Sequence, residues 1–203
     1  MSPGGRPRKP SPAERRERRA TVEDPSEVLD AAARFLEARP RSEAEVRRKL
    51  VRLGYQPALV DEVLTRLVEL RYLDDEAFAR AWVESRDRAR PRGEHALRQE
   101  LGRLGVDRGL VDDVLDERRE AASEDAAAAG DDDPRTPDEA AAERLLRKRL
   151  PSILRETDPR RRRQRAYALL ARSGFSPDVC GSVSRRVLDA GAEDGDAGAV
   201  VID

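Results

Sequence analysis

Arginine and lysine side chains cluster in three stretches of this 203-residue chain, and their type and spacing give it its clearest chemistry. Guanidinium and ammonium groups bind phosphates and carboxylates through charge-assisted hydrogen bonds, so such clusters favour a polyanionic or acidic partner. Four consecutive arginines make the third stretch the densest. We predict partner or nucleic-acid contacts for thirteen residues: Arg47, Arg48, Lys49, Arg52, Arg92, Arg98, Arg103, Arg160, Arg161, Arg162, Arg163, Arg165 and Arg172.

Catalytic chemistry is not expected. His95 is the only histidine, which excludes the pairing of a serine or cysteine nucleophile with a histidine base. Cys180, the only cysteine, falls at an apolar position and is expected to pack in a core rather than to react. Residues 131–133 are three aspartates that lack the spaced ligands and the glycine of a calcium loop. We therefore predict a non-enzymatic protein with no metal and no cofactor, in which His95 faces solvent or a partner.

The composition favours an all-α fold. Charged residues make up 40% of the chain and aromatic residues only 3%, so a single thick core is not expected. Ala, Leu, Arg and Glu are abundant, and these residues lose little rotamer freedom in a helix. No apolar run approaches the roughly 18 residues of a membrane span, and the basic N-terminus is not followed by the apolar segment of a signal peptide. We expect a cytoplasmic protein without membrane contact.

The net charge of -1 conceals strongly polarised segments. Residues 1–20 carry a net charge of +5, residues 120–139 of -7 and residues 189–203 of -5. Such one-sided charge opposes packing, so three disordered segments are predicted: a basic tail over 1–23, an acidic linker over 120–136 and an acidic tail over 191–203. Residues 140–188 hold thirteen basic and four acidic side chains, which marks the last third as the stretch that faces a polyanion.

Helix-start signals recur at short intervals along the chain. A capping side chain followed by Pro or Glu in the first turn satisfies amides that the helix itself leaves without acceptors. Between these signals apolar residues recur every three or four positions, as in Val60, Val63, Leu64 and Leu67, which marks one buried face. Nine signals predict nine helices, which begin near Asp24, Ser42, Gln56, Asp74, Arg90, Asp107, Thr136, Asp158 and Ser176.

The predicted helices fall into triplets with one shared pattern. Gly54, Gly105 and Gly174 each end a basic second helix, where the chain needs a left-handed residue. These glycines are 51 and 69 residues apart, and the larger interval contains the Ala- and Asp-rich linker. Repeats of this size bury a full core only by stacking. We predict three tandem three-helix repeats, at 24–73, 74–119 and 137–190.

Three stretches of the chain resemble the RecX family. Residues 41–54 are similar to the family's opening Arg-Ser, Glu, Lys-Leu and Gly pattern. Residues 72–86 carry the more recognisable segment, an acidic pair followed by Phe-Ala and then by an aromatic residue, Val and Arg. Residues 93–106 resemble a third family segment, and residues 165–176 echo it.

The resemblance implies a function. Members of the family are elongated, curved solenoids of helix-turn-helix-like repeats that bind the RecA filament on single-stranded DNA. They modulate, and mostly inhibit, its recombinase, ATPase and co-protease activities, and they take no small-molecule substrate. Equivalent basic helices in stacked repeats would present a stripe of positive charge to such a long partner.

Two other functions fit the same residues. A helical DNA-binding protein that acts without RecA would use the arginines on the phosphates of single- or double-stranded DNA, but it would concentrate positive charge on one recognition helix per domain. A solenoid adaptor would bind peptides with little dependence on salt. In the first repeat, where Glu43, Glu45 and Glu69 offset the charge, a solvated basic face explains the pattern equally well.

Overall fold

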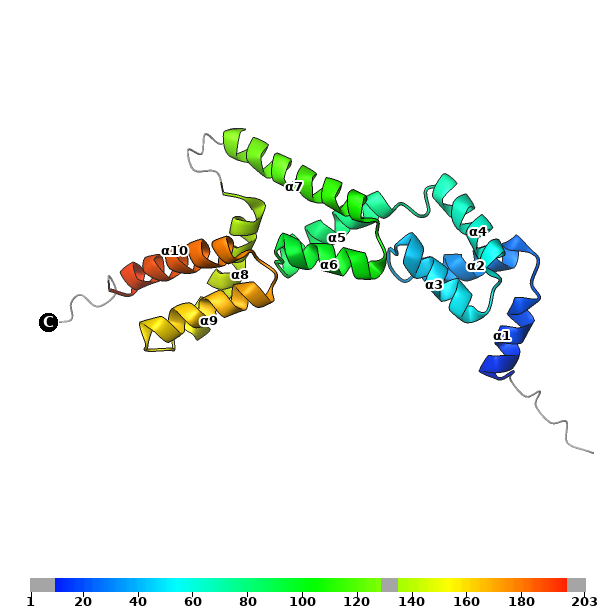
Figure 1. The fold of residues 1–203 in the computed structure, drawn as a ribbon, viewed down its shortest axis with the longest axis horizontal. Helices are drawn as coiled ribbons and strands as arrows, with labels where there is room; N and C mark the ends of the chain where they lie inside the picture. The colour runs from blue at the N-terminus through cyan, green and yellow to red at the C-terminus, as the bar shows by residue number, and fades with distance from the viewer. Residues whose placement is uncertain (1–9, 129–134, 197–203) are drawn as a thin grey trace, which may run out of the picture. The chain divides into compact units, whose positions relative to one another are not determined.

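The computed structural model describes residues 10–128 and 135–196, and these residues form helices and no strand (Figure 1). The predicted all-α class is thereby confirmed for the part of the chain that is described. Its ten helices are α1 (Pro12–Ala20), α2 (Pro25–Leu36), α3 (Glu43–Leu53), α4 (Pro57–Glu69), α5 (Asp75–Ala89), α6 (Glu94–Leu104), α7 (Arg108–Ala128), α8 (Pro137–Ile153), α9 (Pro159–Arg172) and α10 (Pro177–Asp196).

Eight of the nine predicted helix starts coincide with observed ones, because local signals set them: a capping side chain or, at α4, a proline in the first turn. Ser42 and Thr136 each cap a helix through a reciprocal hydrogen bond with the glutamate three residues later. The start expected near Arg90 is wrong. α6 begins at Glu94 instead, because the carbonyl of Gly93 accepts the first helical hydrogen bond from the Leu97 amide at 3.0 Å.

Helix α1 lies inside the stretch predicted as a disordered basic tail. Ser11 and Glu14 form a capping box at its start. Arg16 and Arg19 then donate to backbone carbonyls at the end of α3, at 3.2 and 3.4 Å. Net positive charge predicted disorder here, but the arginines satisfy carbonyls that a helix end leaves without donors.

Helix α7 also differs from the prediction, because it continues through Ala128 into the stretch expected to be an acidic linker. Alanine has the highest helix propensity, and no proline interrupts the sequence before Pro134. Residues 1–9, 129–134 and 197–203 lie outside the described residues, so the predictions for those parts of the tails and the linker, and for the three aspartates at 131–133, concern positions that the structure does not describe.

The chain divides into two compact units. The first comprises the described residues up to Phe78 together with Leu104–Val106, and the second comprises Ala79–Arg103 and the described residues from Asp107 onward. In the first unit, α2, α3 and α4 pack around a core of Val28, Ala32, Val46, Leu50, Tyr55, Val60, Val63, Leu64, Leu67 and Leu73. This core includes Val60, Val63, Leu64 and Leu67, which the three- and four-residue spacing marked as buried.

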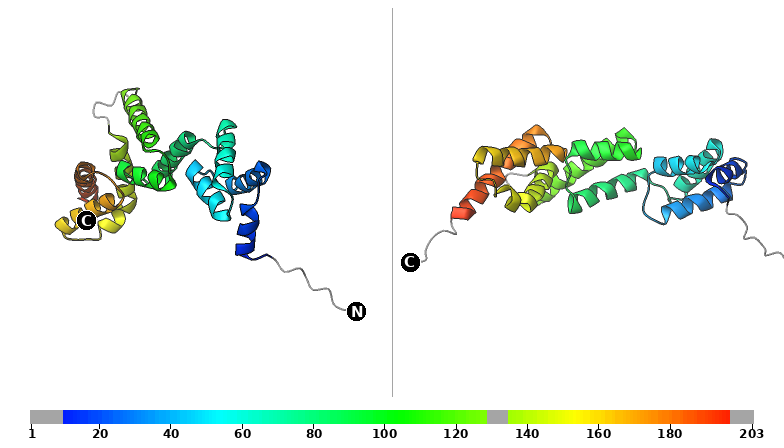
Figure 2. Two further views of the ribbon diagram at one scale, coloured as in Figure 1. Left: turned by 45° about the vertical axis from the view of Figure 1, so that its right-hand side comes forward. Right: turned by 90° about the horizontal axis from the view of Figure 1, so that it is seen from below.

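In the second unit, α8, α9 and α10 pack against one another, as the views of Figures 1 and 2 agree. Their core is formed by Ala141, Ala142, Leu146, Ile153, Ala166, Leu170, Phe175, Cys180, Val183, Val187 and Leu188. The same unit buries Leu97 and Leu101 of α6 and Val111, Val114 and Leu115 of α7. Cys180 is fully buried as predicted, and burial raises the pKa of its thiol.

The three predicted left-handed glycines are confirmed. Gly54, Gly105 and Gly174 have φ angles of 109°, 90° and 84°. Each lies against an earlier helix, and an added Cβ would overlap Arg16, Ala44 or Ala96, respectively. These positions therefore require glycine both for the backbone conformation and for the close approach of a second helix.

Candidate partner interface

The same contact between helices, here called a joint, occurs twice in the chain. One joint lies at the start of α3 and the other at the start of α6, the second helices of the first two repeats. The Ser42 hydroxyl donates to the Leu104 carbonyl at 2.7 Å, within the first unit. The Gly93 amide donates to the Ser173 carbonyl at 3.1 Å, within the second unit. In both joints the accepting carbonyl belongs to the residue before a left-handed glycine. A carbonyl that the end of one helix leaves without a donor is thus satisfied by the start of the equivalent helix in another repeat.

A carboxylate completes each joint. Asp75, at the start of α5, accepts a hydrogen bond from the backbone amide of Glu43 at 2.8 Å. Asp138, at the start of α8, accepts one from the amide of Glu94 at 3.0 Å. Both aspartates thus accept a hydrogen bond from a first-turn amide that its own helix leaves without an acceptor.

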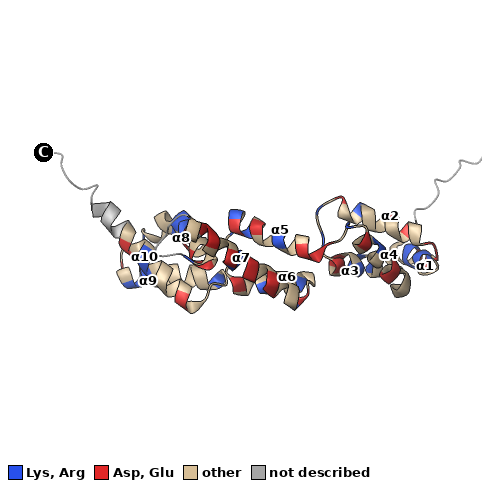
Figure 3. Ribbon diagram, turned by 90° about the horizontal axis from the view of Figure 1, so that it is seen from above, with Lys and Arg blue, Asp and Glu red and all other residues tan. Residues whose placement is uncertain are grey.

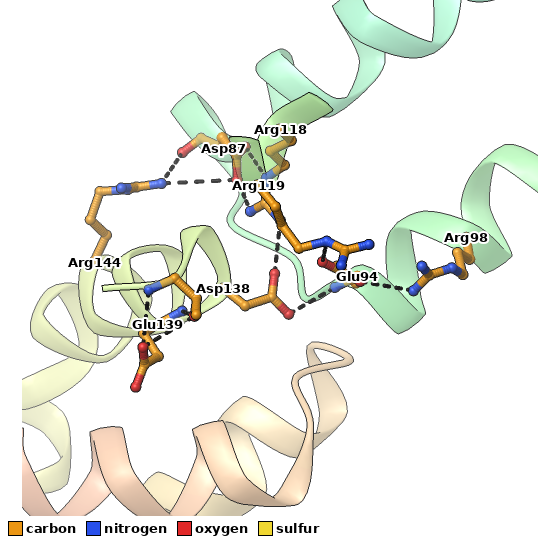
Figure 4. Close-up of polar contacts among 9 residues, drawn as sticks. Asp87, Glu94, Arg98, Arg118, Arg119, Asp138, Glu139 and Arg144 are labelled. Carbon is orange, nitrogen blue, oxygen red and sulfur yellow. Dashed lines mark hydrogen bonds and ion pairs between the residues drawn. The ribbon is translucent and has the colours of Figure 1, made fainter. Parts of the chain in front are cut away.

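An arginine strengthens the joint of the second unit. Arg118 of α7 donates two hydrogen bonds to Asp87 of α5 and one to Asp138 of α8, each at 2.8 Å (Figure 4). Burial alone would lower the pKa of Arg118, but the two carboxylates outweigh it and raise that pKa. With the Glu94 amide on Asp138, the cluster joins α5, α6, α7 and α8. α8 is therefore fixed to α5 and α7 whatever the conformation of the linker between them.

The basic residues predicted in the first two repeats are largely engaged within the protein. Arg47 pairs with Glu43 at 3.2 Å and also with Asp61. Arg98 makes the same arrangement in α6, with ion pairs to an acidic residue one turn earlier and to one on α7, both at 2.9 Å. The hydrogen bond that Arg98 donates to Asp112 on α7 is the largest cause that raises the pKa of Arg98. Each of these arginines links two helices through carboxylates, and these carboxylates offset its positive charge.

Arg92 lies before α6 and belongs to a different cluster. Its Nε is 3.4 Å from Glu100, which also accepts hydrogen bonds from Arg86 at 2.6 Å and from the indole nitrogen of Trp82 at 2.9 Å. Burial would raise the pKa of Glu100, but these donors outweigh it and hold the pKa below its ordinary value. The guanidinium of Arg86 lies over the Trp82 ring, 4.3 Å from its centroid, so Trp82 is half-buried in a polar cluster.

The remaining predicted residues of these repeats differ in their surroundings. Arg48 donates to the Leu104 carbonyl at 2.8 Å, as part of the joint. Lys49 lies 5.5 Å from the centroid of the Phe35 ring. Arg52 and Arg103 are exposed, and Arg103 donates to a glutamine side chain one turn away. Arg48, Lys49 and Arg52 belong to the first unit and Arg103 to the second.

The third repeat is different. Arg160, Arg163 and Arg172 of α9 are exposed and form no ion pair with any acidic side chain in residues 10–128 and 135–190. Of the other predicted arginines on this helix, Arg161 is 3.7 Å from an exposed aspartate and Arg165 is 3.5 Å from a glutamate. Arg162 donates to a backbone carbonyl, which carries no net charge. Because few carboxylates lie near these arginines, the start of α9 stays strongly cationic.

Four basic residues of the third repeat escaped the sequence prediction. Lys148, Arg149, Arg155 and Arg185 are exposed and likewise have no ion-pair partner among the side chains of residues 10–128 and 135–190. They lie on α8, in the loop that follows it and on α10, whereas the prediction followed the second helices alone. In Figure 3, acidic and basic residues occur together along α5, α6 and α7. The local excess of basic residues over 140–188 was the signal that could have identified them.

The histidine that the sequence singled out takes part in no such cluster. His95 is exposed and lies 2.8 Å from the side-chain nitrogen of Gln99, one turn along α6. In the described residues, no three histidine, cysteine or acidic side chains are grouped so that they could hold a metal ion. None of the helices within 10–128 and 135–196 is both long and apolar enough to span a membrane.

Models of three protein domains match the chain. They are described as the first, second and third three-helix domains of RecX, and they match residues 29–67, 74–115 and 137–183. Each matched range lies within one of the three repeats that the sequence predicted. The helix α1 precedes all three.

Individual relatives agree with these matches. The chain is 38% identical to a regulatory protein RecX of Deinococcus radiodurans over 179 residues, which cover 87% of this chain and 77% of that protein. It is 45% identical to a regulatory protein RecX of a Mycobacterium species over 82 residues, which cover 40% of this chain and 45% of that protein. A RecX crystal structure from Lactobacillus salivarius shares the fold with a TM-score of 0.65 at 19% identity, over 81% of this chain and 96% of that one. This chain belongs to the RecX family of regulatory proteins.

Proposed function

We propose that the protein is a non-enzymatic regulator that binds the RecA recombinase filament on single-stranded DNA and lowers its recombinase, ATPase and co-protease activities. Membership of a family whose curated members are named regulatory proteins supports this proposal. Because RecA acts on DNA in the cytoplasm, that is the compartment in which the proposal places the protein.

The observation that carries the proposal is the unequal use of the arginines. In the first two repeats Arg47 and Arg98 are offset by acidic neighbours on their own and adjacent helices. In the third repeat Arg160, Arg163 and Arg172 stay exposed and form no ion pair with the side chains of residues 10–128 and 135–190. Cations that are not already paired are available to displace counterions from a phosphate backbone or from an acidic protein surface. The third repeat is therefore the part that we assign to the filament.

The joints between helices support the same assignment. The cluster of Asp87, Arg118 and Asp138 fixes the first helix of the third repeat to helices of the second. A cationic surface held in this way keeps its orientation when it meets a partner, so less conformational entropy is lost on binding than if the repeat were loosely tethered.

A titration of the protein into RecA assembled on single-stranded DNA tests the proposal, with ATP hydrolysis and filament length as readouts and binding to naked DNA measured in parallel at the same salt. The proposal expects hydrolysis to fall and filaments to shorten at protein concentrations well below those that coat naked DNA. Tight binding to naked DNA with no RecA-specific effect would instead support a DNA-binding protein that acts without RecA.

A charge-reversal variant tests the assigned surface. The double variant Arg160→Glu/Arg163→Glu should weaken filament binding by about tenfold or more and lower the salt dependence of binding by roughly two counterions. Arg34→Glu/Arg66→Glu is the matched control, since it changes the net charge equally and both arginines make only exposed pairs within their own helices. Equal weakening by both variants would mean that net charge alone, and not the third repeat, determines binding.

A further inference from the structure

An apolar groove follows the outer side of α2 and α4 in the first unit. It consists of two adjoining hollows that share Leu29. One has a volume of about 580 Å³ and lies beside Pro25 and Val63. The other has a volume of about 440 Å³ and lies beside Leu67 and Tyr72. Hollows of this size are large enough to take several apolar side chains of a partner.

The backbone at one end of the groove is held so that apolar side chains face solvent. Tyr72 is 71% exposed and Leu70 is 46% exposed, although both lie beside the fully packed Leu73. Between them Arg71 has a φ of 60°, a conformation that costs free energy in a residue other than glycine. The amide of Tyr72 donates to the Leu67 carbonyl at 2.9 Å, which holds this turn in place. A strained turn that exposes a tyrosine and a leucine is a feature that core packing does not explain.

The rim of the groove is acidic. Asp30 and Glu37 line the hollow beside Tyr72, and Glu62 and Glu69 line the other one. The single basic residue on this rim, Arg66, is paired with Glu69 at 3.1 Å. A surface of this sign repels phosphate groups and attracts lysine and arginine. Nucleic acid is thus a poor occupant of the groove, in contrast to the free cations of the third repeat.

We propose that this groove binds an amphipathic helix of another protein, with an apolar face seated between α2 and α4 and with lysine or arginine residues beside that face. The groove runs along α2, whose 12 residues span about 18 Å, so a helix of similar length matches it. Helices dock in such grooves through apolar side chains at positions i, i+3, i+4 and i+7, with polar residues at the rim supplying specificity. The site is separate from the cationic surface assigned to the filament and does not depend on that assignment.

The experiment uses the full chain and a fluorescein-labelled peptide of about 14 residues, with leucines on one helical face and lysines elsewhere, and measures binding by fluorescence polarisation. A peptide of the same composition with its leucines spread around the helix is the control ligand. The groove variant Leu70→Ser/Tyr72→Ser should bind the amphipathic peptide about tenfold more weakly, a change of about 1.4 kcal/mol. That change is smaller than the free energy of burying one leucine side chain.

A matched control variant removes exposed apolar side chains elsewhere. Val51→Ser/Tyr167→Ser replaces an aliphatic residue and a tyrosine that are 43% and 41% exposed and do not line either hollow. This variant should bind the peptide as the unchanged protein does. Equal weakening in both variants, or equal binding of both peptides, would overturn the proposal. A concentration-dependent dimer in analytical ultracentrifugation that the groove variant abolishes would also overturn it, because the occupant would then be a second copy of this chain.

Discussion

Removal of the Arg118 side chain is the sharpest test of how the second and third repeats are joined. The side chain is 9% exposed and donates three hydrogen bonds of 2.8 Å to two carboxylates. The variant Arg118→Ala leaves Asp87 and Asp138 facing each other with no cation between them. The two carboxylates would then repel each other at a site that is only partly exposed to water.

The size of the effect follows from burial. Breaking a buried ion pair by removing one partner costs 3–5 kcal/mol, because an uncompensated charge stays behind. Asp87 is 25% exposed and Asp138 is 15% exposed, so water compensates part of the lost partner. We therefore expect Arg118→Ala to lower the free energy of unfolding by about 3 kcal/mol.

Arg80→Ala is the matched control. Arg80 also donates two hydrogen bonds of 2.8 Å, from α5 to Glu117 of α7, but the two side chains are 49% and 48% exposed. Exposed pairs of this kind contribute about 1 kcal/mol or less. The same bidentate geometry thus appears twice, once shielded from water and once not.

Urea unfolding at neutral pH, followed by far-ultraviolet circular dichroism and by the fluorescence of Trp82, measures both losses. A cycle with Asp87→Ala adds a second check, because the double variant should lose less than the sum of the single variants. The reasoning is refuted if Arg118→Ala and Arg80→Ala lose the same free energy, since burial would then have no bearing on the strength of the joint.

Three further outcomes are expected from the joints. Burial raises the pKa of Asp75, so the stability that this group contributes is present below its unfolded pKa and is lost as the pH rises through its folded pKa. The variant Asp75→Asn keeps an oxygen for the Glu43 amide, and it should be more stable than the unchanged protein from about pH 4 upward. Urea unfolding at a series of pH values measures this difference. Gly93→Ala should lower the free energy of unfolding by roughly 2–3 kcal/mol, since its Cβ would overlap the Gly174 carbonyl, and a loss within 0.5 kcal/mol of zero would exclude the close approach. Deletion of residues 1–23 removes α1 from the end of α3 and should cost about 1–2 kcal/mol, and an unchanged thermal midpoint would show that α1 does not act as a cap.

Much of the fold could be predicted from local chemistry. Ser42 and Thr136 cap their helices through neighbours three residues away, and Gly105 ends α6 through its own backbone freedom. Such signals need no knowledge of the rest of the chain. The start of α6 was misplaced because the backbone amide of Gly93, the residue that precedes this helix, is bound by Ser173, which lies far away in the sequence. Helix α1 was missed for the same reason, since its arginines donate to the end of α3.

The candidate site was predictable only in part. The charge excess over 140–188 identified the third repeat as cationic, but the sequence did not show which helices would supply carboxylates to Arg47 and Arg98. Their acidic partners lie 14 residues away on the next helix, at a spacing that becomes a contact only when the two helices pack.

By itself the sequence determined the all-α class, the three repeats, the left-handed glycines and the family, because caps, apolar periodicity and recurring motifs act over a few residues. Only the tertiary structure decided which cations remain free, how Asp87, Arg118 and Asp138 join the second and third repeats, and where an apolar groove stays open beside Tyr72. Ion pairs and grooves depend on side chains from different helices lying within a few ångströms of one another, and that proximity is a property of the packed chain.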